Sequence, residues 1–117
     1  MEKFEAINRT AIVVVPKKPF WDWVNGVEPG SESELTPKIK GEGTIYLLPE
    51  FDDEDELEKH LQKISKEVFE NELMAWFTDE SLWPQNRNWS MFREWFDCRI
   101  HEIVHDTVHE KVRKEQL

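Results

Sequence analysis

The sequence lacks several features on which whole classes of protein depend. Its 117 residues include one cysteine, Cys98, so no internal disulfide can form and a reducing, cytoplasmic compartment is expected. It has only four glycines and no G-x-S-x-G, P-loop or G-x-G-x-x-G string. No apolar run approaches about 18 residues, and the N-terminus lacks the basic-then-apolar order of a signal peptide. We therefore expect no cofactor, no membrane span and no nucleotide or serine-hydrolase chemistry.

An excess of positive charge is also missing. The formal net charge is −10, from 25 acidic and 15 basic residues. Such a surface repels phosphate backbones and anionic lipid, which excludes nucleic acid and membrane as expected partners and leaves a basic protein or a cation admissible. Six tryptophans and seven phenylalanines supply large apolar areas to bury. The length suits one folded domain over residues 1–117.

Two short apolar runs have the pattern of β-strands. Residues 11–15 are continuous and mostly β-branched and end at Pro16, which is typical of a strand covered on both faces. Residues 44–48 form a second run, which ends at another proline, Pro49. Between them, residues 28–43 are rich in Pro, Gly, Ser and Glu without periodicity. We expect a mobile surface loop there.

Two short helices are indicated by terminal signals. Pro19 stands where a first helical position would be, and Gly26 stands where a helix would stop. In the C-terminal half, Ser90 is placed to cap a helix that carries the apolar residues at 91–96. Both segments are predicted to pack one apolar face against the core.

The longest helix signal follows the acidic run at residues 52–56, whose charges suit the positive end of a helix. Its first apolar face carries Leu57, Leu61, Ile64 and Val68. A second group lies on a rotated face and comprises Phe69, Leu73, Trp76 and Phe77. The helix therefore either breaks near residues 70–71 or is buried on two sides. We expect it to cover a sheet in which Val13 and Leu47 lie on neighbouring strands.

The segment at residues 98–106 has two open interpretations. Its apolar positions keep helical spacing, and Glu102 breaks the alternation of a strand, but a sheet of only two strands would be marginal. We favour a strand and keep a continued helix as the alternative. Residues 107–117 are predicted to be a polar tail. The fold class is thus α+β, a single small domain with a two- or three-stranded sheet covered by helices.

The same segment contains His101, Glu102 and His105 in the string H-E-x-x-H, the zinc-hydrolase signature when it lies on a helix. On a helix the histidines lie about 6 Å apart along the axis, whereas on a strand they lie about 13 Å apart and cannot share one ion. A zinc site also needs a third ligand. The longer metzincin motif, H-E-x-x-H-x-x-G-x-x-H, requires a histidine at the position where this chain has Lys111. A zinc-dependent hydrolase, with Glu102 as its base, is therefore only the alternative function.

Four stretches of this chain are similar to a family of small, acidic, uncharacterised bacterial proteins. They are residues 16–23 (PKKPFWDW), 46–53 (YLLPEFDD), 78–84 (TDESLWP) and 91–97 (MFREWFD), with His101 behind the last. The resemblance implies no function. It implies a strand-like tail and a small residue after the matched histidine, so Glu102 and His105 are departures that weaken the zinc interpretation.

Three tryptophans lie beside turn residues or away from the main apolar stripes. With nearby polar residues they form a predicted partner patch of Trp21, Asp22, Trp83, Arg87, Trp89 and Arg93. The competing interpretation is ordinary packing under loops. We predict a non-enzymatic cytoplasmic protein-binding or adaptor domain, with an acidic surface that suits a basic protein partner. The oligomeric state does not follow from the sequence.

Overall fold

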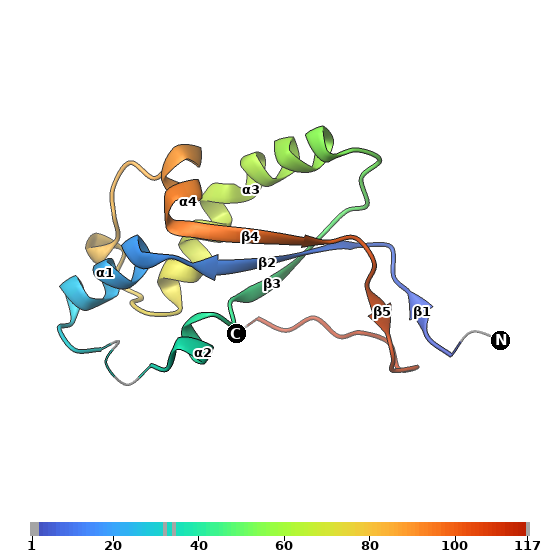
Figure 1. The fold of residues 1–117 in the computed structure, drawn as a ribbon, viewed down its shortest axis with the longest axis horizontal. Coiled ribbons are helices and arrows are strands. Elements are labelled where there is room, and N and C mark those ends of the chain that lie inside the picture. Colours follow the sequence, from blue (N-terminus) through green and yellow to red (C-terminus); the bar gives the residue numbers. More distant parts are fainter. Residues whose placement is uncertain (1–2, 32, 34, 117) are drawn as a thin grey trace.

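The computed structural model describes residues 3–31, 33 and 35–116 and has the predicted α+β class. Its main sheet is antiparallel, in the order β3-β2-β4, with β3 at Thr44–Leu48, β2 at Thr10–Pro16 and β4 at Phe96–His101. Figure 1 shows helix α3 (Glu54–Met74) running along one side of this sheet, with α1 (Lys18–Val27) at its end. Residues 98–101 therefore belong to the favoured third strand rather than to a helix.

The two faces of the sheet differ in what covers them. Ile12 and Val14 of the central strand are fully buried on the inner face, where Ile12 lies opposite Tyr46 and Ile100. Val13 and Leu47 belong to neighbouring strands, as predicted, but to the outer face, where Leu47 is half exposed. The expectation that a helix covers both of them was wrong because strand residues alternate between faces. The outer face remains largely open on β3.

The long helix α3 spans Glu54–Met74 without a break. Asp53 caps it, because its carboxylate accepts a hydrogen bond of 2.8 Å from the N–H of Glu56. Both apolar faces are used: Leu57 and Leu61 are buried on one, and Phe69 and Leu73 on the other. The structure therefore confirms that the helix is buried on two sides and does not break near residues 70–71.

Shorter helices close the aromatic end of the core. Helix α1 spans Lys18–Val27 and α4 spans Trp89–Trp95. Asn88, not Ser90, caps α4, because its side chain accepts a hydrogen bond from the N–H of Met91. Ser90 already lies inside the helix, because the residue with extended backbone that precedes the helix is Asn88. A 3-10 helix, η1, at Glu80–Leu82 precedes this turn.

In their described part, residues 28–43 include one element of regular structure. They contain the short helix α2, Pro37–Lys40, which the Thr36 side chain caps through the N–H of Ile39. The turn into β3 needs Gly43, whose φ is +70° and whose missing Cβ would lie 2.5 Å from the carbonyl oxygen of Val14. Glu32 and Glu34 of this predicted loop lie outside the described residues.

A two-stranded ribbon extends from the main body. Strands β1, Glu5–Ala6, and β5, His105–Asp106, pair with each other and project from the end of the sheet away from α1 and α4 (Figure 1). The radius of gyration is 16.2 Å, against about 13 Å for a compact domain of this length. The predicted tail follows, exposed and without helix or strand from 107 to 116; Leu117 lies outside the described residues. None of the described helices is long and apolar enough to cross a membrane.

Candidate functional site

The predicted partner patch does not form one surface. Trp83 is buried with only 3% of its surface exposed, and its ring N–H donates a hydrogen bond of 2.7 Å to the carbonyl of Phe77. This correction has a simple cause: residues 78–88 fold back over the end of α3, so a tryptophan in that turn faces inward. A satisfied, buried indole holds the turn in place.

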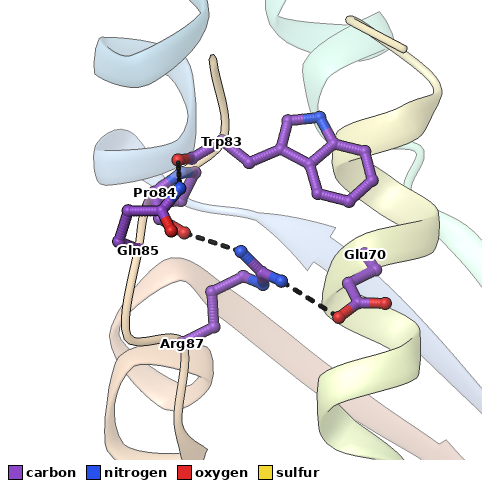
Figure 2. A network of polar contacts seen from close by, with 5 residues as sticks. All are labelled: Glu70, Trp83, Pro84, Gln85 and Arg87. Atoms are coloured by element: carbon purple, nitrogen blue, oxygen red, sulfur yellow. Dashed lines mark hydrogen bonds and ion pairs between the residues drawn. The ribbon is translucent and has the colours of Figure 1, made fainter. Parts of the chain in front are cut away.

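Arg87 belongs to the same structural network, which Figure 2 shows. Its guanidinium donates hydrogen bonds to the carbonyl of Pro84 at 2.8 Å and to the carboxylate of Glu70 at 3.0 Å. It also lies 5.6 Å from the ring centre of Trp83. The side chain of Arg87 is only 16% exposed, so it joins the turn to α3 and presents little surface to a partner.

The other four predicted residues divide into two places. Trp21 is half-buried and packs edge-to-face on Phe20 and Trp76, while Asp22 pairs with Lys18 at 2.9 Å on the exposed side of α1.

Trp89 stacks on Phe92 with ring centres 5.7 Å apart, and the Arg93 guanidinium lies 5.8 Å from the Trp89 ring. Within the described chain, no ring or polar contact joins Trp21 to Trp89. Only Trp89 and Arg93 therefore remain as a shared surface element from the predicted patch.

The H-E-x-x-H string does not lie on a helix. His101 ends β4, His105 begins β5, and the residues between them are neither helix nor strand. In the part of the chain that the structure describes, no group of three or more His, Cys, Asp or Glu side chains is placed to hold a metal. The helix on which the alternative function depends is therefore missing.

A groove lies between helix α3 and strand β4. Its first hollow, of about 490 Å³, is lined by Glu54 and Leu57 of α3 and by Ile100 of β4. A second hollow, of about 400 Å³, is lined by the next turn of α3 with Glu58 and Leu61, and again by Ile100. Because they share Ile100 and follow successive turns of one helix, the two hollows lie end to end. We call them together the β4–α3 groove.

One end of the β4–α3 groove is acidic. A third hollow, of about 320 Å³, adjoins the first and shares Glu54 and Glu102 with it, and Glu50 and Asp52 also line it. None of these four carboxylates has an ion-pair partner among the described residues.

The opposite end of the groove is different. Lys17, Arg93, Trp89 and Asp97 line the second hollow there, where β4 begins. The groove therefore has an acidic end beside the start of α3 and a mixed, partly aromatic end beside α4.

The floor of the groove borders an unpaired strand edge. In the described chain β4 pairs with β2 only, which leaves its other edge free. Every second residue of such an edge directs its N–H and C=O away from the sheet. Ile100 is 48% exposed and Ile103 is 74% exposed at this place. A strand edge with exposed apolar side chains beside it is a template for pairing with another extended chain.

The single thiol of the chain also lies in the groove. Cys98 is half-buried and lines the second hollow. Burial, with a smaller contribution from the neighbouring Asp97 carboxylate, raises the pKa of the Cys98 thiol to about 11. The thiol is therefore protonated at neutral pH and is a weak nucleophile, which suits a groove residue rather than a catalytic one.

A buried carboxylate lies elsewhere, between α3 and β3. Glu72 is 7% exposed and accepts hydrogen bonds from the Tyr46 hydroxyl at 2.6 Å and from Thr44 at 3.1 Å. Burial raises the pKa of Glu72, although both hydrogen bonds oppose the change. Burial also raises the pKa of Tyr46. Both carboxylate oxygens have donors, so this network joins β3 to α3.

The sequence reasoning missed the groove residues Glu58, Cys98 and Ile100. Glu58 was indistinguishable from other solvated acids, because nothing local says that β4 lies beside α3. A signal for the strand was present, since Cys98 and Ile100 alternate with the charged Asp97 and Arg99. The alternation identifies a strand with one polar face but not its position at the edge of the sheet.

The comparisons with known proteins leave this geometry as the only basis for a function. No protein-family model matches the chain. Searches of curated proteins and of solved structures likewise give no significant match. Neither a family nor an activity is therefore transferred to this protein.

Proposed function

We propose that this protein is a non-enzymatic, cytoplasmic binding domain that takes up an extended, basic segment of a partner protein in the β4–α3 groove. One observation carries the proposal: the same groove combines a free strand edge, an apolar floor and a carboxylate-lined end. Each of these features selects one property of the ligand.

The free edge of β4 selects an extended backbone. A peptide that adds to an edge strand gains main-chain hydrogen bonds, and pockets beneath alternate side chains provide the specificity. The floor at Leu57, Leu61 and Ile100 offers such pockets for apolar side chains on one face of the peptide. A helical ligand would leave the N–H and C=O groups of the edge without partners.

The acidic end selects positive charge. Glu50, Asp52, Glu54 and Glu102 lack ion-pair partners among the described residues, so a lysine or arginine of the ligand gains from their combined field. Rim charges of this kind mainly speed association and exclude acidic competitors. At the mixed end, Trp89 and Arg93 provide the aromatic and cationic contacts that are common at binding hot spots.

The test is binding of a peptide of about eight alternating lysine and valine residues, which spans about 26 Å when extended. Isothermal titration calorimetry should detect it, and replacing its lysines by glutamate should abolish binding. The variant Glu54→Lys with Glu58→Lys should bind it at least roughly tenfold more weakly, because both rim carboxylates are reversed. Bound peptide should also slow alkylation of Cys98, the only cysteine of the chain.

The matched control is Asp55→Lys with Glu67→Lys, which makes the same charge change on α3 at residues that do not line the groove. Its affinity should equal that of the natural chain. Methylating alternate peptide N–H groups should abolish binding if the peptide pairs with β4. Equal loss in the control, or binding that survives both the groove variant and N-methylation, would remove the groove as the binding site.

A further inference from the structure

The tail of the chain has the chemistry of a groove ligand. Every described residue from 107 to 116 is exposed, including Val108 at 60% and Val112 at 68%. Although the protein is strongly acidic, this segment carries three basic residues against two acidic ones: Lys111, Arg113 and Lys114 against Glu110 and Glu115. Valines among basic residues in an extended segment match the apolar floor and acidic end of the groove.

We infer that residues 107–114 of one molecule occupy the β4–α3 groove of a second copy. The inference rests on the proposed function, because it names an occupant of the same groove. It adds that the protein associates with itself and that a partner protein must displace the tail. Two molecules that exchange tails reciprocally form a closed, two-fold pair, the commonest form of homo-oligomer.

The order of charges in the tail fixes its direction. Acidic Glu110 precedes Lys111, Arg113 and Lys114. Where β4 begins, the groove has Lys17 and Arg93 balanced by Asp97 and Glu58, whereas beyond the end of β4 it has only acidic charges, at Glu102 and Glu54. The basic residues of the tail reach the net-acidic end of the groove, and Glu110 reaches Lys17 and Arg93, when the tail runs parallel to β4. From Phe96 to Glu102 an extended chain covers about 20 Å, which six or seven tail residues match.

The same reasoning favours the groove of a second copy over the molecule's own groove. The tail follows β4 in the chain, so it can enter its own groove only by turning back at residues 102–104 and running antiparallel. Lys111, Arg113 and Lys114 would then lie about 20 Å back along β4, where Lys17 and Arg93 offset the attraction of Asp97 and Glu58, and far from the net-acidic end. In addition, β5 pairs with β1 and leads the chain away from the groove. A second copy avoids both difficulties.

The experiment is a charge exchange measured by sedimentation equilibrium at about 0.05 M salt, where surface charges act over more than 10 Å. The natural chain should reach twice the mass of one chain as concentration rises. Reversing the groove, with Glu54→Lys and Glu58→Lys, should weaken association at least tenfold. Reversing the tail, with Lys111→Glu, Arg113→Glu and Lys114→Glu, should do the same.

Restoring complementarity is the decisive step. A chain that carries both reversals should associate again, and so should an equimolar mixture of the two singly reversed chains. The control Asp55→Lys with Glu67→Lys has the net charge of the groove variant and should associate like the natural chain. Association that persists after tail reversal, or no recovery in the doubly reversed chain, overturns the inference.

The experiments distinguish failure of the tail inference from failure of the proposed groove function. If the natural chain stays monomeric while the lysine-valine peptide binds, the tail is not the occupant and the groove function stands. If the peptide fails to bind as well, both the inference and the proposed function are wrong. A free peptide of residues 104–116 that binds the tail-reversed chain, but not the groove-reversed chain, supports both.

Discussion

Glu72 shows how one buried side chain can determine the pH dependence of stability. Its carboxylate is held by the Tyr46 hydroxyl and Thr44, yet burial still raises its pKa. Because the folded chain holds this proton more tightly than the unfolded chain, Glu72 contributes most to stability below its ordinary pKa of 4.5. That contribution is lost as pH rises through the higher pKa of the folded state.

We therefore predict that the effect of Glu72→Gln on stability depends on pH. Near about pH 4 the amide closely resembles the protonated acid and the two chains should be similarly stable. As pH rises, the natural chain should lose free energy of unfolding relative to the variant. Urea unfolding at several pH values measures the difference, with Glu67→Gln on the exposed side of α3 as control. A difference that is independent of pH would contradict the prediction.

The same network gives a second prediction for Tyr46. Tyr46→Phe removes the 2.6 Å hydrogen bond to a carboxylate that remains buried, so the free energy of unfolding should fall by roughly 1–3 kcal/mol at neutral pH. The loss should be smaller in acid, where Glu72 is protonated and needs its donors less. Unfolding in urea at both pH values is the measurement. An equal loss at both would mean that the ring, and not the hydroxyl, matters.

At the scale of the elements, α3 is the centre of the fold because it packs on two sides. Phe69 is 1% exposed and contacts the rings of Phe92, Trp95 and Phe96, with centres 5.1 to 6.3 Å apart. These rings belong to α4 and the first residue of β4. Phe69 therefore fixes how α4 and β4 lie against the helix, and with them the mixed end of the groove.

Phe69→Ala should lower the free energy of unfolding by roughly 3–5 kcal/mol, since it leaves a cavity among aromatic rings that cannot all collapse. Met74→Ala, at the half-exposed end of the same helix, should change it by less than about 0.5 kcal/mol. Denaturant unfolding with an unchanged m-value is the measurement. Comparable losses in the two variants would mean that Phe69 does not have this central place.

At the scale of the whole molecule, the dominant feature is unbalanced negative charge. The chain has a net charge of −10, and among the described residues oppositely charged side chains pair at Asp22, Glu70 and Asp97. Between residues 50 and 58, by contrast, acids follow one another around the start of α3. Like charges three or four residues apart on a helix each cost roughly 0.2–0.5 kcal/mol.

We predict that salt stabilises this protein. Raising the ionic strength shortens the Debye length from about 30 Å at 0.01 M to about 10 Å at 0.1 M, which screens repulsion more than the few exposed ion pairs. The melting temperature should rise with sodium chloride and rise less in Asp55→Lys with Glu67→Lys. A melting temperature that falls with salt would mean that attractive pairs outweigh the repulsion.

The sequence by itself determined the class of fold and most of its elements. Strand runs at 11–15 and 44–48, the capped helix after Asp53 and the alternation of Cys98 and Ile100 are all local patterns, because helix and strand periods are properties of neighbouring residues. The predicted patch failed at Trp83 and Arg87 for the complementary reason. Burial there depends on how residues 78–88 fold over α3, which no local pattern records.

Only the tertiary structure decided where a site lies. Glu54 and Glu58 are one helical turn apart in any helix, but they line a groove only because β4 pairs with β2 and lies beside α3. The pairing order β3-β2-β4 also decides that β4, and not the more apolar β2, has a free edge. Strand order and helix placement result from the packing of the whole core, and they bring an acidic helix start and a short strand together into a single groove.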